Sequence, residues 1–174
     1  EIFESATLSL QSLHQNEIDA QYQLKTEISF ISQILAEISS TENFLNGNDI
    51  TNYLQMKISE NPSLKYLLIF GDETHFLPNF QGEVPADDLY TWNENGYPQL
   101  ATGRIPVATT NEADIVVDKI RNYMLNPAPG IWRQKISLLA DDHRHPTSSA
   151  STEFSHTSNT EELMEIIKDE ALVQ

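Results

Sequence analysis

Hydrophobic residues near the start of the chain change their spacing, and each spacing predicts a different element. From Phe3 to Leu13 they recur every three or four positions, which predicts an amphipathic helix over residues 2–15. Apolar and polar residues alternate over 22–28, a period of two that predicts a half-buried strand near a sheet edge. The helical spacing returns over 30–38. This part of the chain therefore predicts helix, strand and helix in succession.

The rest of the chain alternates predicted helices with predicted strands. First we expect a helix capped by Asn48 or Asp49 and ended by Asn61-Pro62, then a strand over 65–70 and a long loop over 71–98. A strand over 100–107 and a helix from the capping box of Thr109 and Glu112 to Asn126 follow. The chain then continues with a strand over 135–140, a loop over 143–159 and a last helix from Ser158 that carries Ala171. The central strands are apolar throughout, which is typical of a parallel sheet covered by helices on both faces. The sequence therefore predicts an α/β fold of three α/β/α layers around a mostly parallel sheet, as one domain over residues 1–174.

The charge balance excludes several classes of partner. The chain has 10 Lys and Arg against 26 Asp and Glu, a formal net charge of -16, which repels nucleic-acid phosphates and anionic lipid surfaces. No apolar run approaches the roughly 18 to 20 residues that a membrane span requires. We therefore expect no nucleic-acid partner and no membrane insertion.

Cysteine usage and the first residues limit the chemistry further. The sequence has no cysteine, which excludes disulfides, thiolate metal sites and a cysteine nucleophile within these 174 residues. The chain starts at Glu1 rather than at methionine, with helical spacing from the outset. We therefore expect a piece of a longer polypeptide, in which the lack of a signal peptide says nothing about location.

Acidic residues follow two of the predicted buried strands, and another pair lies in the long loop. These acids are Asp72 with Glu73 after the strand 65–70, Asp141 with Asp142 after the strand 135–140, and Asp87 with Asp88 in the loop 71–98. Ligands of open parallel sheets gather at the carboxyl ends of the strands, because the strand-to-helix loops converge there. If the three groups meet, like charges raise one another's pKa unless a cation lies between them.

Three interpretations of these acids stay open. They can cap helices and turns, as Asp often does. They can surround Arg104, whose guanidinium grips a carboxylate with two bonds and could answer Asp87, Asp88 or Asp142. They can bind a hard cation such as Ca²⁺ or Mg²⁺, which takes oxygen ligands. We also expect Gly71 and Gly103 to lie where a side chain would crowd the backbone.

Other chemistries have less support in the sequence. A zinc site would need His143, His145 and His156 together with further ligands, and exposed loop histidines are the simpler interpretation. His75 could be an acid-base group or an ordinary loop residue. The Gly-x-Ser-x-Gly elbow of serine hydrolases and a phosphate-binding glycine loop are both missing from the sequence. The strand ending at Asp141 also suits a Mg²⁺-binding receiver-like domain, although that strand comes fourth rather than first.

Several stretches, taken in order, resemble the gingipain family of cysteine peptidases. They are KYLLIFGDETHF, VPADDLYTW, QLATGRIPVATTNEADIVVDKIRNYMLNP, the isolated Trp132 and KISLLADD, and the resemblance covers roughly residues 50–172. It implies a caspase-like, Rossmann-like fold of two subdomains, of which this chain is the N-terminal, non-catalytic one. The catalytic histidine and cysteine of the family belong to the other, absent subdomain. No histidine of this chain matches the catalytic position.

The resemblance also implies a set of functional properties. The parent protein is expected to be an endopeptidase that hydrolyses peptide bonds through a Cys-His dyad beyond this chain, secreted or at the cell surface of a bacterium. Its expected partners are the C-terminal catalytic subdomain of the same protein and protein or peptide substrates. Its expected cofactor is calcium, with the acidic landmarks as candidate ligands: Asp72, Asp87, Asp88, Asp141 and Asp142. Departures at Glu73-Thr74 and Leu89-Tyr90 leave an alternative, an inactive peptidase relic that acts as a surface scaffold or adhesion module.

Overall fold

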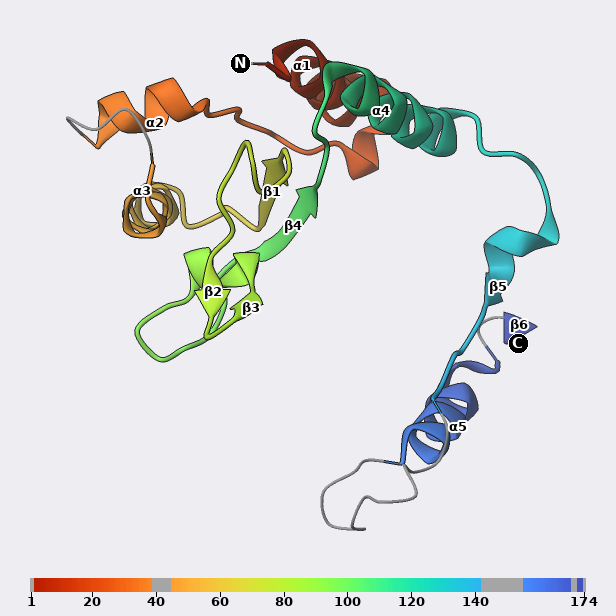
Figure 1. The fold of residues 1–174 in the computed structure, drawn as a ribbon. Helices are drawn as coiled ribbons and strands as arrows, with labels where there is room; N and C mark the ends of the chain where they lie inside the picture. The colour runs from red at the N-terminus through yellow and green to blue at the C-terminus, as the bar shows by residue number, and fades with distance from the viewer. Residues whose placement is uncertain (1, 39–44, 142–154, 170–171, 174) are drawn as a thin grey trace. The chain divides into compact units, whose positions relative to one another are not determined.

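The computed structural model describes residues 2–38, 45–141, 155–169 and 172–173, and the contacts divide the chain into two compact units, Glu1–Pro127 and Ala128–Gln174. The elements of the first unit are the helices α1 (Glu4–Ser12), α2 (Ile31–Glu37), α3 (Gly47–Glu60) and α4 (Thr110–Leu125), the strands β1 (Tyr66–Phe70), β2 (Phe80–Gln81), β3 (Val84–Pro85) and β4 (Ala101–Ile105), a π-helical turn at Leu13–Glu17 and 3-10 turns at Ala20–Tyr22 and Asp87–Thr91 (Figure 1). The single domain expected over residues 1–174 stays a prediction.

The central sheet of the first unit pairs β1 with β4 in parallel, from Tyr66 opposite Ala101 to Phe70 opposite Ile105. Successive residues of a strand point to opposite faces of a sheet. Phe70 and Ile105 accordingly pack into one hydrophobic cluster, whereas Leu67 and Ile69 pack into another. The predicted parallel pairing is therefore confirmed, and hydrophobic residues pack on both faces of the sheet. The expectation of a fully buried strand at 65–70 was wrong, because Tyr66 and Leu68 are 63% and 50% exposed.

Each face of the sheet has its own set of helices. The first cluster joins α1 and the following π-helical turn to α4 and the β4 exit; its buried residues are Phe3, Ala6, Leu10, Leu13, Ile18, Val107, Ala113 and Val117. The second joins α2, α3 and the turn Asp87–Thr91; its buried residues are Ile34, Ile50, Tyr53, Leu54, Ile69 and Tyr90. Figure 1 shows α1 beside α4 and α2 beside α3. The unit thus has the three α/β/α layers of the predicted fold class.

Two helix starts test the predicted caps. Thr109 Oγ1 accepts a hydrogen bond from the Glu112 N–H at 3.2 Å, and a Glu112 carboxylate oxygen accepts from the Thr109 N–H, so this capping box is confirmed. The cap of α3 is Asn46, whose side chain accepts from the N–H groups of Asn48 and Asp49. The prediction of Asn48 or Asp49 as the cap was wrong by two or three residues, because Asn46 forms its own box with Asp49.

The strand expected over 22–28 is not present in the described residues. A 3-10 turn occupies Ala20–Tyr22, Gln23 after it is extended, and residues 23–30 belong to no helix or strand. The Thr26 carbonyl instead accepts hydrogen bonds from the side chains of Gln11 and Gln15, at 3.2 and 2.8 Å. The prediction of a strand was wrong, because no described strand pairs with this segment and side chains of the first helical segment bind its Thr26 carbonyl instead. That segment also runs further than the expected residues 2–15, since the π-helical turn ends at Glu17.

The second unit is smaller and more exposed. Its elements are a 3-10 turn at Ile131–Gln134, the strands β5 (Lys135–Ile136) and β6 (Leu172–Val173), which pair in parallel, and the helix α5 (His156–Ile167). The strand expected over 135–140 is shorter than predicted, because the described pairing ends at Ile136 and Leu139 is 92% exposed. The last helix starts two residues before Ser158 and ends at Ile167, before Ala171. No helix among the described residues combines the length and apolarity of a membrane span.

Candidate functional site

The turn that leaves β1 requires a glycine at its first position. Gly71 has a φ of +129°, and its N–H donates to the Ile105 carbonyl at 2.9 Å. A Cβ at this position would lie 3.0 Å from the His75 Cβ and 3.4 Å from the Phe3 ring. The expected crowding at Gly71 is confirmed. The same expectation for Gly103 was wrong, because its Cβ would meet no heavy atom of the structure within 4 Å.

Asp72 organises the residues that follow. Its Oδ1 accepts three hydrogen bonds, from the Thr74 N–H at 3.1 Å, the Thr74 hydroxyl at 2.7 Å and His75 Nδ1 at 2.8 Å. The hydrogen bond from His75, followed by that from Thr74, lowers the pKa of Asp72 from 3.8 to about 2. An ionised carboxylate can only accept, so the imidazole carries its proton on Nδ1. The turn interpretation of the acids is therefore confirmed for Asp72.

The depressed pKa of Asp72 predicts a pH dependence of stability. Because the folded value lies below the ordinary one, Asp72 stabilises the fold above about pH 4, and this contribution is lost as the pH falls toward 2. We expect the wild-type chain to melt above an Asp72→Asn variant at pH 5, with the difference shrinking between pH 4 and pH 2. Circular dichroism melts of both proteins across this range test the prediction. A difference that is constant with pH would contradict it.

Arg104 lies on β4 opposite Ile69, and its side chain donates to the turn that follows β1. Its Nε and Nη2 donate to the two carboxylate oxygens of Asp87 at 2.6 and 2.7 Å. Its Nη1 donates to the carbonyls of Gly71 at 2.8 Å, Asp72 at 3.3 Å and Phe76 at 2.8 Å. The side chains of Arg104 and Asp87 are only 14% and 19% exposed, and the bond to Asp87 raises the pKa of Arg104. The predicted arginine network is thus confirmed, with Asp87 as its carboxylate.

Tyr90 packs against Phe76, next to this network. It is fully buried, and its hydroxyl donates to the Leu77 carbonyl at 2.5 Å. Its ring meets Phe76 edge-on, with 6.2 Å between centroids, and the Arg104 guanidinium lies 5.8 Å from the Phe76 centroid. Burial, reinforced by the negative charge of Asp87, raises the pKa of Tyr90 to about 12. Tyr90 therefore stays a neutral hydrogen-bond donor across the physiological pH range.

The remaining predicted ligands have different surroundings. Asp88 Oδ2 accepts a hydrogen bond from Trp92 Nε1 at 3.3 Å. Asp141 is exposed and belongs to the second unit, and Asp142 lies outside the described residues, as do His143 and His145. His156 is exposed at the start of α5. Among the described residues, no group of three or more acids and histidines is placed to hold a metal ion.

A calcium ion at the end of β1 would take oxygen ligands from Asp72 and Asp87. Calcium takes six to eight oxygen ligands around one point. Both oxygens of Asp87 and three nearby carbonyls accept from Arg104, while one oxygen of Asp72 accepts three hydrogen bonds. This arrangement suits a guanidinium and does not fit a calcium ion at Asp72 and Asp87. The wider ligand set with Asp88, Asp141 and Asp142 stays a prediction.

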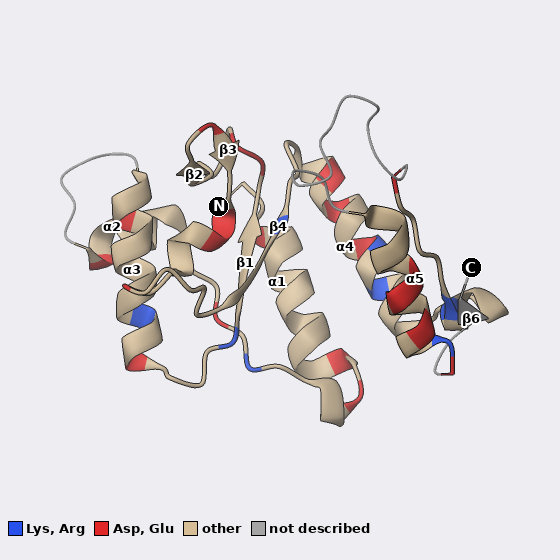
Figure 2. Cartoon of the chain, turned by 90° about the horizontal axis from the view of Figure 1, so that it is seen from below, with Lys and Arg blue, Asp and Glu red and all other residues tan. Residues whose placement is uncertain are grey.

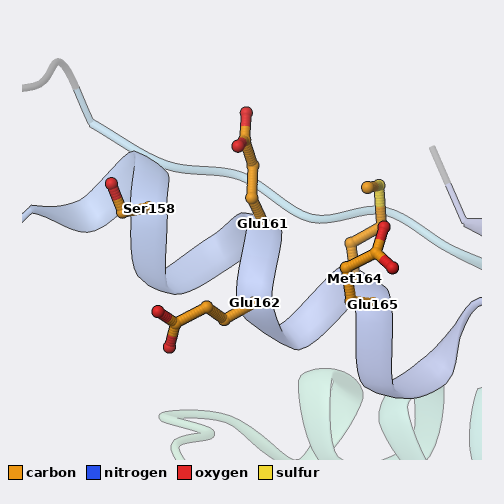
Figure 3. A pocket seen from close by; sticks show the side chains of 5 residues that line it. All are labelled: Ser158, Glu161, Glu162, Met164 and Glu165. Carbon is orange, nitrogen blue, oxygen red and sulfur yellow. The ribbon is translucent and has the colours of Figure 1, made fainter.

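Along the chain, acidic residues outnumber basic ones by 26 to 10. Figure 2 shows Asp and Glu on most helices, with few Lys or Arg between them. A hollow on α5 is lined by Ser158, Glu161, Glu162, Met164 and Glu165, whose side chains leave one helix in several directions (Figure 3). Ligand sites usually combine converging polar groups from several elements. The hollow on α5 is therefore a weaker candidate for a ligand site than the end of β1.

Comparison with known proteins decides the family. A family model described as peptidase family C25 matches residues 1–173. The chain belongs to peptidase family C25. This is the gingipain family that the sequence landmarks resemble, so the recognition from sequence is confirmed. A search of curated proteins found no match.

The C25 chain is also similar in fold to a solved structure, the complex of the pro- and mature domains of Porphyromonas gingivalis RgpB. The two share 15% sequence identity with a TM-score of 0.62, and the match covers 95% of this chain. This similarity supports the caspase-like α/β fold. The chain spans 37% of the length of that RgpB chain.

In this C25 chain, the spacing of sequence motifs identified the acids and Arg104 but not their surroundings. Thr74, Phe76 and Tyr90 complete the network, and none of them was expected there. The order Asp-x-Thr at Asp72 is a known signature of a side-chain turn and could have identified Thr74. Phe76 enters the network through its carbonyl and ring, and Tyr90 through burial. Those roles depend on the fold rather than on any local pattern.

Proposed function

We propose that this chain is the structural N-terminal subdomain of a gingipain-like cysteine endopeptidase, whose Cys-His dyad lies beyond these residues. The match to peptidase family C25 over residues 1–173 carries the proposal. Cysteine peptidases attack the peptide carbonyl with a thiolate, and the 174 residues contain no cysteine. The nucleophile and its base would therefore come from the catalytic subdomain. In this role the chain supports catalysis without touching the reacting atoms.

The site at the end of β1 is consistent with such a supporting role. Two pairs of side chains lie in it: Arg104 with Asp87, and Asp72 with His75. The bonds from Arg104 join the turn after β1 to the 3-10 turn Asp87–Thr91, two segments far apart in sequence. Such cross-linking fixes loops at the carboxyl edge of the sheet. We propose that this edge is rigid so that it can support the rest of the parent peptidase.

The remaining parts of the proposal concern the whole protein. The structure described for RgpB is a complex of pro- and mature domains, and by analogy we propose that this chain associates with other domains of its own protein. Secretion to the surface of a bacterium, and protein or peptide substrates, follow from the family resemblance. Calcium is proposed for the parent protein, with donors outside the Arg104 network.

We expect the chain by itself to hydrolyse no peptide bond, because it contains no thiol. Purified protein should leave fluorescein-labelled casein intact and should not react with a fluorescent iodoacetamide. The matched comparison is the longer protein encoded by the same reading frame, which should be labelled at one reactive cysteine and should cleave casein. Turnover by the short chain that a thiol reagent blocks would contradict the proposal. So would a reading frame that closes at Gln174.

The alternative, an inactive relic that acts as a scaffold or adhesion module, is favoured by the departures at Glu73-Thr74 and Leu89-Tyr90. The longer protein separates the two hypotheses. A relic would lack a Cys-His pair after later strands, and would neither label nor cleave. An active peptidase would do both.

A further inference from the structure

Five oxygen atoms surround the Arg104 guanidinium at the carboxyl end of β1. They are the carbonyls of Gly71, Asp72 and Phe76 on Nη1, and the two carboxylate oxygens of Asp87 on Nε and Nη2. Each nitrogen of the planar group therefore donates to at least one acceptor. A ring face, that of Phe76, lies 5.8 Å from the guanidinium carbon. Together these groups form what we call the oxygen cage.

The atoms of the oxygen cage are held by contacts that do not involve Arg104. Gly71 is fixed by its N–H bond to Ile105, and Asp72 by its N–H bond to the Val107 carbonyl. The Phe76 N–H donates to the Asp72 carbonyl at 2.9 Å. Asp87 begins the turn Asp87–Thr91, which buries Tyr90 in the second hydrophobic cluster. The acceptors are therefore positioned by the fold and should largely persist when the arginine side chain is removed.

The spacing of the cage favours a planar guanidinium over a metal ion. The carbonyls gather at one nitrogen, whereas the carboxylate lies along the edge formed by the other two. A calcium ion is a point charge that needs its ligands at 2.3–2.6 Å, so it cannot contact both groups from one position. A planar fork of N–H donors matches both at once.

We propose that the end of β1 is a preformed receptor for a planar guanidinium group, which Arg104 fills in the native chain. Arg104 neutralises Asp87 and adds bonds between the two turns, while contacts outside its side chain position the acceptors. This receptor role goes beyond the proposed peptidase role and does not depend on it. If the proposal is right, a variant without the Arg104 guanidinium should bind a free guanidinium compound at the same position.

The test is chemical rescue of an Arg104→Ala variant of the 174-residue chain. We expect the variant to melt below the wild type and to regain a few degrees with about 20 mM methylguanidinium, because a ligand that binds the folded state stabilises it by mass action. Ammonium and calcium chloride at matched ionic strength should not raise its melting temperature. If the variant does not fold unaided, recovery of folded protein on refolding with each cation replaces the melting curve.

A matched control is available on α4. Arg121 also pairs with an acid, Glu17, and donates to Ser9, yet it is 26% exposed and its hydrogen bonds to the described residues come from Nη1 and Nη2 alone. Arg121→Ala should not be rescued, and a double variant that adds Asp87→Asn to Arg104→Ala should lose its rescue. Rescue by calcium would overturn the proposal in favour of a metal cage. A lack of rescue by methylguanidinium, or equal rescue of Arg121→Ala, would also overturn it.

Discussion

Replacing Arg104 by methionine is expected to lower the melting temperature by roughly 5–10 °C. The methionine side chain fills much of the volume but leaves the Asp87 carboxylate without its bidentate partner and three carbonyls without Nη1. Removing one partner of a buried ion pair costs about 3–5 kcal/mol, and the 14–19% exposure of this pair places the loss toward the lower value. A chain of this size loses about 2–4 °C per kcal/mol.

Two controls separate the loss of the network from the loss of a charge. Arg104→Lys keeps the positive charge but lacks the planar fork, so we expect an intermediate melting temperature. Arg133→Met removes an arginine from an exposed position and should change the melting temperature little. Differential scanning fluorimetry at pH 7 measures all three. Equal melting temperatures for wild type and Arg104→Met would show that the network does not contribute to stability.

Truncating Tyr90 should have an effect of similar or larger size. Tyr90→Ala removes a fully buried ring and its hydrogen bond to Leu77, and large-to-small changes of buried aromatic residues cost about 3–5 kcal/mol. We expect a fall in melting temperature of roughly 6–20 °C. The cavity would open beside Phe76, whose carbonyl accepts from Arg104, so the bonds of Arg104 should loosen as well.

The conservative variant Tyr90→Phe isolates the hydroxyl group. It keeps the ring and leaves the buried Leu77 carbonyl unpaired, which costs about 1–3 kcal/mol. Urea unfolding of Tyr90→Ala, Tyr90→Phe and Arg104→Met, with a double variant of Tyr90→Ala and Arg104→Met, measures the coupling between the two positions. Additive free energies would mean that Tyr90 does not support the network.

Local patterns determine several features of this chain. The run of apolar residues at 66–70 forms β1, and the Thr109 and Glu112 spacing forms the cap of α4, because both depend on neighbours in sequence. The strand expected over 22–28 is missing because a strand depends on a partner that is distant in sequence. A strand needs a partner, and here Gln11 and Gln15 supply the hydrogen-bond donors instead. An alternating pattern of apolar and polar residues does not show whether a partner strand lies beside the segment.

In the candidate site, too, some features follow from local sequence and others from the fold. Acids after apolar strands, and an arginine within a strand, are visible in the sequence and were interpreted as turns, a network or a metal site. Choosing among these required knowing that β1 and β4 pair in parallel with Ile69 opposite Arg104, which places the guanidinium beside the turn after β1. Asp87 was selected over Asp88 because Asp88 faces Trp92.

The sequence by itself determined the α/β class, the parallel sheet and membership of the C25 family, since each rests on apolar periodicity or on ordered local motifs. The tertiary structure alone decided that Arg104 takes five oxygens from segments up to 33 residues away, and that Tyr90 is buried against Phe76. The physical reason is that hydrogen bonds and burial depend on distances in space, which the register of β1 and β4 sets and no single stretch of sequence contains.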